Sequence, residues 1–98
     1  MNYSVFRADG KGLVDFDEIA LHGDGFVYVD ADKFWGGKKS KPYIGLPIHC
    51  PTWLDLFNEA MRQQQKTLDF HHCFFEDITV VKISNNPELF RIHLHLGS

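Results

Sequence analysis

The chain lacks several motifs that mark common catalytic and nucleotide-binding sites. It has no glycine-rich phosphate loop, no Gly-x-Ser-x-Gly nucleophile turn and no Asp-x-Asp-x-Asp-Gly calcium loop. Residues 36–39 carry glycine and lysine, but not at the spacing that a phosphate loop requires. The sequence therefore points away from the enzymes that such motifs identify, and we expect a protein that is not an enzyme.

Cysteines and long apolar runs are also scarce. Cys50 and Cys73 are the only two cysteines, and they do not form a Cys-x-x-Cys pair. No apolar stretch approaches the roughly 20 residues that cross a membrane, and residues 1–6 read as a strand, not as a secretion signal. We expect free thiols, a reducing cytoplasmic location and no membrane partner.

Positive charge is sparse as well. The formal net charge is −3 and the sequence pI is about 6.0. The lysines gather only at Lys38, Lys39 and Lys41, so a nucleic acid is not expected as the main partner. The six histidines would make the net charge positive if all were protonated. Since the reference imidazole pKa is about 6.5, we expect solubility and assembly to depend on pH.

Large apolar side chains are abundant. Hydrophobic residues make up 44% of the chain and aromatic residues 14%, including nine Phe. A chain of 98 residues can bury one core, so we expect residues 1–96 to form a single domain, with Gly97-Ser98 a vector-derived tail. A surplus of large apolar groups on a short chain is typical of an oligomer or a partner-binding module.

Turn signals divide the first half of the chain into strands. We expect strands at residues 3–8, within 13–22, and at 26–29, followed by a structured loop over 34–51. A hairpin turn at Gly23-Asp24 would set Leu21 opposite Phe26 and Ile19 opposite Tyr28.

One amphipathic helix is expected after Pro51. Thr52 can cap its first turn, and Asp55 stands three residues later, where a capping-box partner belongs. Apolar residues recur at helical spacing at Trp53, Leu56, Phe57, Ala60 and Met61. This pattern predicts a helix that lies on a sheet and frays beyond Lys66.

A closing hairpin is the clearest unit of the sequence. Residues 90–96 alternate apolar and polar without a break, which predicts a strand with one apolar face and one face that carries His93 and His95. A four-residue loop over 85–88 predicts three pairs on one face, namely Ile83 with Phe90, Val81 with Ile92 and Thr79 with Leu94, which would bury an apolar stripe beneath the helix.

These elements predict an α+β fold. We expect an antiparallel sheet of about five strands in the order β-β-β-α-β-β, with the helix packed on one face. The outer face of the last hairpin would mix apolar side chains with imidazoles, and such a face is where another chain is expected to bind.

The pair His93 and His95 is the first candidate for chemistry. A His-x-His on one strand directs both imidazoles to the same side, about 7 Å apart by the rise of a strand, and could hold zinc with a third ligand. The candidates for that ligand are His22, His49, His71, His72 and Cys73. Alternating histidines on a half-exposed strand explain the pattern more simply than a metal site, so the cofactor prediction is none, with zinc as the alternative.

Two other groups of polar residues are of the types that act in catalysis. Cys50 adjoins His49, but adjacent residues rarely face each other, and no catalytic residue is predicted. The hairpin at Gly23-Asp24 would also set Asp17 opposite Asp30, where the two carboxylates would raise each other's pKa or share a cation.

The aromatic residues suggest a pocket or an interface. Apolar walls with a few polar groups are what small-molecule pockets need. The candidates are Trp35, Tyr43, Trp53, His71 and His72.

Two functions follow from these expectations. The preferred one is a non-enzymatic interaction protein, a homodimer or a binder of a protein partner, that uses the outer face or an edge of the sheet. The alternative is a protein that binds a small apolar ligand, or a minor enzyme, at the aromatic pocket, with a His/Cys metal site as one version. A strict monomer in solution would contradict the first, and metal-free protein would contradict the metal version of the second.

Overall fold

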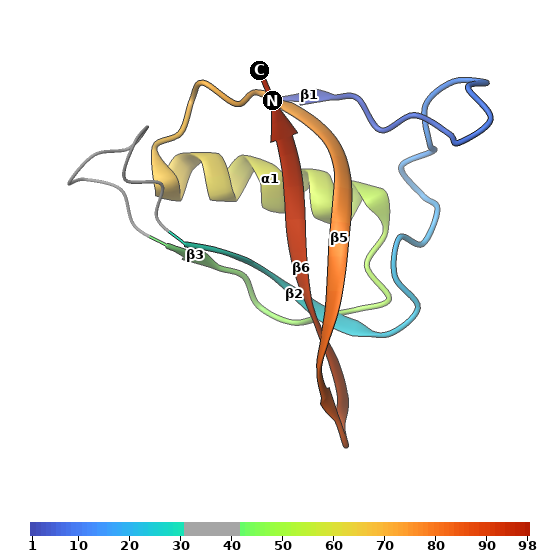
Figure 1. Cartoon of the computed structure of the whole chain (residues 1–98), viewed down its shortest axis with the longest axis vertical. Coiled ribbons are helices and arrows are strands. Elements are labelled where there is room, and N and C mark those ends of the chain that lie inside the picture. Colours follow the sequence, from blue (N-terminus) through green and yellow to red (C-terminus); the bar gives the residue numbers. More distant parts are fainter. Residues whose placement is uncertain (31–41) are drawn as a thin grey trace.

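A computed structural model describes residues 1–30 and 42–98 of the chain, and in it one helix covers one face of a six-stranded sheet (Figure 1). The elements in chain order are β1 (Asn2–Tyr3), β2 (Asp24–Val29), β3 (Tyr43–Ile44), β4 (Ile48–His49), α1 (Trp53–Thr67), β5 (Phe74–Asn85) and β6 (Glu88–Gly97). This arrangement confirms the predicted α+β class. The predicted candidate Trp35 lies outside the described residues.

The sheet is mixed, whereas the sequence suggested a purely antiparallel one. Its strand order is β1-β5-β6-β2-β3, and β4 pairs with the other end of β2. The pairs β1–β5 and β2–β6 are parallel, and the remaining pairs are antiparallel. Strands that pair in parallel come from distant parts of the chain, so no turn sequence between them predicts the pairing.

The predicted hairpin at Gly23-Asp24 does not form. Residues 13–22 contain no strand and make only single bridges, from Leu13 to Phe6 and from Ile19 to Thr52. Instead, β2 lies beside β6, where Val27 pairs with Ile92 and both side chains are fully buried. Burial of two large apolar side chains is worth several kcal/mol, which outweighs the preference of a turn sequence.

The helix begins as the sequence predicted. The Thr52 hydroxyl accepts the Asp55 N–H, and the Asp55 carboxylate accepts the Thr52 N–H, which completes a capping box. The helix ends at Thr67, and the C-cap residue Leu68 has a left-handed φ of 61° and donates its N–H to the Gln64 carbonyl. Of the predicted apolar stripe, Leu56 and Ala60 are fully buried, whereas Met61 is exposed.

The β5–β6 hairpin forms, but its predicted register is wrong by one residue. Asn85 pairs with Glu88 across a two-residue turn, and β5 has bulges near Glu76 and Ile83. Because a bulge moves every following side chain to the other face, Val80 rather than Val81 lies opposite Ile92. In the same way Ile78 takes the predicted place of Thr79 opposite Leu94. Val80 and Ile78 thus face the helix, where the expected register had placed Val81 and Thr79.

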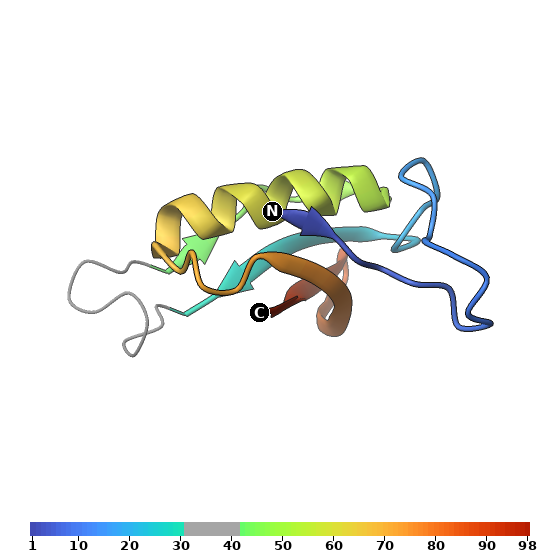
Figure 2. The ribbon, with the colours of Figure 1, turned by 90° about the horizontal axis from the view of Figure 1, so that it is seen from above.

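The core lies between α1 and the sheet face beneath it. Its fully buried apolar residues are Val5, Val27, Leu56, Ala60, Phe75, Ile92 and Leu94. Figure 2 shows α1 along one side of the sheet, and no other helix or strand of the described chain covers the opposite side. We call that side the open face. As predicted, His93 and His95 lie on it and are exposed.

Within the described residues, no helix is both long enough and apolar enough to cross a membrane.

Candidate functional site

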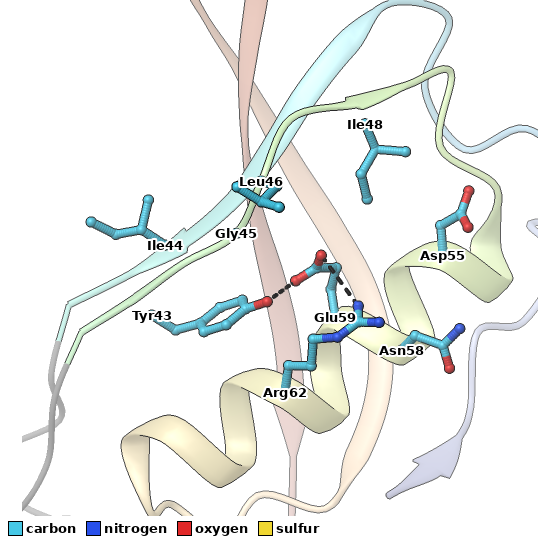
Figure 3. Close-up of a pocket in the computed structure, with 9 residues that line it drawn as sticks. All are labelled: Tyr43, Ile44, Gly45, Leu46, Ile48, Asp55, Asn58, Glu59 and Arg62. Carbon is cyan, nitrogen blue, oxygen red and sulfur yellow. Dashed lines mark hydrogen bonds and ion pairs between the residues drawn. The ribbon is translucent and has the colours of Figure 1, made fainter.

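A cavity of about 450 Å³ opens between α1 and the chain that runs from β3 to β4 (Figure 3). Its lining residues are Tyr43, Ile44, Gly45, Leu46, Ile48, Asp55, Asn58, Glu59 and Arg62. Aliphatic side chains come from the β3–β4 side and polar ones from the helix. The volume falls within the range of pockets that hold small ligands.

Glu59 is the central polar residue of this cavity. Only 6% of its side chain is exposed, although it carries a carboxylate. The Tyr43 hydroxyl donates a hydrogen bond to Glu59 Oε2, and Arg62 Nη1 lies 3.4 Å from Oε1. Burial, followed by this contact with Glu59, raises the pKa of the Tyr43 hydroxyl above its ordinary value. The site therefore holds a neutral phenol and an ion pair around one buried carboxylate.

Gly45 allows the chain that follows β3 to come this close to the carboxylate. A Cβ at this position would lie 2.9 Å from Glu59 Oε2, nearer than real Cβ atoms come to other atoms. The Gly45 N–H donates to the Val27 carbonyl at 2.8 Å, so the backbone cannot move away without losing that bond. The next residue, Leu46, has 82% of its surface exposed at the cavity rim.

The predicted aromatic pocket is only partly assembled. Tyr43 lines the cavity, but Trp53 does not, and its ring centroid lies 6.0 Å from that of the core residue Phe75. His71 and His72 lie in the connection from α1 to β5, where His72 Nδ1 is 2.7 Å from Asp69 Oδ2. The structure therefore does not bring together the four candidates that lie within the described residues.

Glu59 and Arg62 were not predicted as site residues, although the sequence contained a signal. Glu59 follows Leu56 by three residues, so it falls within the apolar stripe of the helix. A carboxylate in a buried stripe needs a partner, because an unpaired buried charge is costly. The distant partner, Tyr43, could be identified only from the fold.

His93 and His95 lie side by side, with ring centroids 5.5 Å apart. His95 Nε2 is 2.5 Å from Thr79 Oγ1 across the strand pair. Partial burial lowers the pKa of His93, and the neighbouring His95 and Arg91 lower it further. Among residues 1–30 and 42–98, no three His, Cys, Asp or Glu side chains are placed to hold one metal ion.

Cys50 and His49 do face each other, contrary to expectation. Cys50 Sγ lies 3.7 Å from His49 Nε2, and His49 Nδ1 lies 2.6 Å from Asp24 Oδ1. The two aspartates predicted to face each other do not. Residue 17 lies in no strand, and Asp30 instead accepts the Tyr28 hydroxyl at 2.5 Å.

Comparison with known proteins gave no relative: no family model matches the sequence, and no curated protein or solved structure matches the chain.

Proposed function

We propose that this protein is a non-enzymatic interaction protein that works as a homodimer, paired through the free edge of β5. We call residues 77–82 of that strand the β5 edge. Within the described chain, β1 pairs with β5 only at Phe74 and Phe75, and β6 takes the other side. Figure 1 shows β5 and β6 extending well beyond their neighbours. An unpaired strand edge is a template for pairing with another chain, and this edge carries the proposal.

The hydrogen-bonding groups of the β5 edge alternate along the strand. The Ile78 N–H is bonded to its neighbour Asp77 Oδ1 at 2.8 Å and so points away from β6. By the alternation of an antiparallel ladder, the N–H and C=O groups of Val80 and Lys82 point the same way. A second copy in antiparallel orientation, with Val80 facing Val80 across a two-fold axis, would satisfy these groups symmetrically.

Charge and local geometry favour a second copy over an open-ended stack. The β5 edge has Asp77 at one end and Lys82, which is ion-paired with Glu88 at 2.9 Å, at the other, so an antiparallel copy brings ends of unlike charge side by side. The bulges near Glu76 and Ile83 interrupt the regular ladder at both ends. Bulges limit edge pairing, which favours a closed dimer. Val81, 45% exposed on the open face, would be covered at the junction.

The decisive experiment measures the oligomeric state by analytical ultracentrifugation over a wide concentration range. One pair of strands buries little area, so we expect a reversible monomer–dimer equilibrium. Lys82→Glu removes the charge complementarity and should shift the equilibrium towards monomer. Adding Asp77→Lys restores the complementarity in reverse and should recover the dimer. Lys11→Glu makes the same charge change in an exposed turn and should have no effect. A monomer at every concentration, or an unchanged dimer in Lys82→Glu, would refute the proposal.

A second candidate function is the binding of a small zwitterion in the Glu59 cavity. The Glu59 carboxylate supports it, because this charge is only 6% exposed while its cationic partner Arg62 is 61% exposed and 3.4 Å away, so the buried charge is incompletely compensated within the protein. An amine could replace Arg62 against the Glu59 carboxylate, while the freed guanidinium binds a carboxylate of the ligand. The aliphatic wall of Ile48 and Leu46 would accept an apolar side chain. An aliphatic amino acid combines these three features.

Titration with L-leucine, followed by NMR chemical shifts of the Tyr43 and Arg62 signals, tests this function. We expect saturable shifts at millimolar concentration, and weaker binding of isoamylamine, which lacks the carboxylate. Arg62→Gln should abolish the difference between the two ligands, because it removes the group that recognises the carboxylate. The absence of saturable shifts, or equal affinity of both ligands for the unaltered protein, would exclude zwitterion binding.

A further inference from the structure

Three side chains ahead of α1 form a chain of polar contacts that ends in a thiol. Asp24 belongs to β2 and His49 to β4, and the two residues are direct partners in that strand pair. This pairing holds His49 Nδ1 at 2.6 Å from Asp24 Oδ1, which leaves Nε2 to face Cys50 Sγ at 3.7 Å. A nucleophile, a base and a residue that orients the base is the arrangement by which enzymes activate weak nucleophiles.

The backbone explains why neighbouring residues face each other here. Successive side chains of a strand point to opposite faces, so Cys50 would ordinarily point away from His49. Cys50 has a left-handed φ of 46°, which ends β4 and turns its side chain back. Its N–H donates to the Gly23 carbonyl at 2.9 Å, and Pro51 fixes the chain on the other side. The contact is thus built into the fold.

The thiol and its base can be reached from solvent. The His49 side chain is 84% exposed and that of Asp24 50%, while Cys50 is half-buried. Acyl transfer finds no support, because the nearby amides are already used. The Cys50 N–H donates to the Gly23 carbonyl, and the first two N–H groups of α1, those of Trp53 and Leu54, donate to the carbonyls of Glu18 and Phe16 in the segment before β2. An oxyanion would need such donors to be free.

We propose that Cys50 is a site of reversible mixed-disulfide formation with small disulfides. In this reaction His49 Nε2 accepts the Cys50 thiol proton, and the sulfur attacks one sulfur of the small disulfide. A new S–S bond forms, the original S–S bond breaks, and the leaving thiolate takes the proton back from His49. Asp24 acts as a positioning residue that keeps the imidazole directed at the sulfur. The small disulfide is the oxidant, and the products are the protein mixed disulfide and one small thiol.

The second cysteine provides an internal control for the test. Cys73→Ser isolates Cys50, and Cys50→Ser isolates Cys73, so each rate of reaction with oxidised glutathione can be followed by intact-mass spectrometry. We expect Cys50 to react at neutral pH at least about tenfold faster than Cys73, and the adduct to be removed by dithiothreitol. Equal rates of the two cysteines would overturn the proposal.

The pH dependence of the reaction rate separates the contribution of the base, His49, from the intrinsic ionisation of the thiol. In the Cys73→Ser background, His49→Gln should slow Cys50 more at pH 7 than at about pH 9, because free thiols ionise near pH 8.5 without a base. Asp24→Asn should change the pH profile in the same direction by a smaller factor. Both side chains are exposed, and circular dichroism checks that each variant is folded. A profile unchanged by His49→Gln would overturn the assigned role of the imidazole.

Discussion

Glu59 is the residue whose placement has the largest energetic consequence. A buried carboxylate is tolerated only when hydrogen bonds and opposite charge replace its hydration. Here the Tyr43 hydroxyl and Arg62 provide both, and the Arg62 contact is long at 3.4 Å. The hydrogen bond from Tyr43 therefore supports most of the charge.

Removal of that hydrogen bond should destabilise the fold. We expect Tyr43→Phe to lower the free energy of unfolding by about 1.5–3 kcal/mol at neutral pH, the range for a hydrogen bond to a charged group. Tyr28→Phe is the matched control, because the Tyr28 hydroxyl donates to Asp30 at an exposed position. Its effect should stay within about 1 kcal/mol. Urea unfolding measures both, and equal effects of the two variants would contradict the role given to Tyr43.

Two residues show how far sequence reasoning reached at this scale. Glu59 could have been suspected, because helical spacing puts it in the buried stripe with Leu56. The contact between Cys50 and His49 could not, because it depends on one left-handed φ angle that nothing at Cys50 requires. Cysteine is not among the residues that favour that conformation, so the sequence pattern carried no sign of it.

Among the elements, the existence and start of the helix were predictable, its buried face was predicted only in part, because Met61 is exposed and Glu59 is buried, and the strand pairing was not predicted. The capping box and the apolar spacing of α1 are local signals, because each depends on residues only three or four positions apart in the chain. The β5–β6 hairpin was predictable as a unit because its strands are adjacent in the chain. Its register was not, since the bulge near Ile83 has no marker in the sequence.

The parallel pairs define the limit of a strand-by-strand prediction. β2 and β6 are more than 50 residues apart, and their contact depends on the burial of Val27 against Ile92. The prediction of a local hairpin followed the turn signal at Gly23-Asp24, which the structure does not use in that way. Two short strands, β3 and β4, pair with the edge of β2 that β6 leaves free.

For the whole molecule, one helix over one sheet leaves much of the sheet exposed. The thinnest dimension is 16 Å, about the thickness of a helix packed on a single sheet. Titratable groups therefore lie on both sides: His93 on the open face, and Tyr3 and Tyr43 on the side of the helix. The pH dependence of the free energy of unfolding should therefore reflect groups on both faces of the sheet.

The free energy of unfolding is expected to fall at both ends of the pH scale. Burial lowers the pKa of His93 in the folded protein, so on acidification the unfolded chain takes up the proton first, and stability is lost from about pH 6.5 downwards. Burial, with Glu18 and Asp15 nearby, raises the pKa of Tyr3 to about 12. The unfolded chain then loses that proton first, and stability is lost from about pH 10 upwards, with Tyr43 acting in the same direction.

Urea unfolding from about pH 8 to 5.5 separates the histidines from the carboxylates, because most carboxylates titrate below that range, and a variant of His93 then separates it from the other five histidines. His93→Gln should reduce the acid loss measured there, and Tyr3→Phe should reduce the alkaline loss measured from about pH 9 to 11 without changing the acid side. Each variant thus serves as the control for the other. If His93→Gln leaves the acid slope unchanged, the imidazole on the open face is not what couples folding to pH.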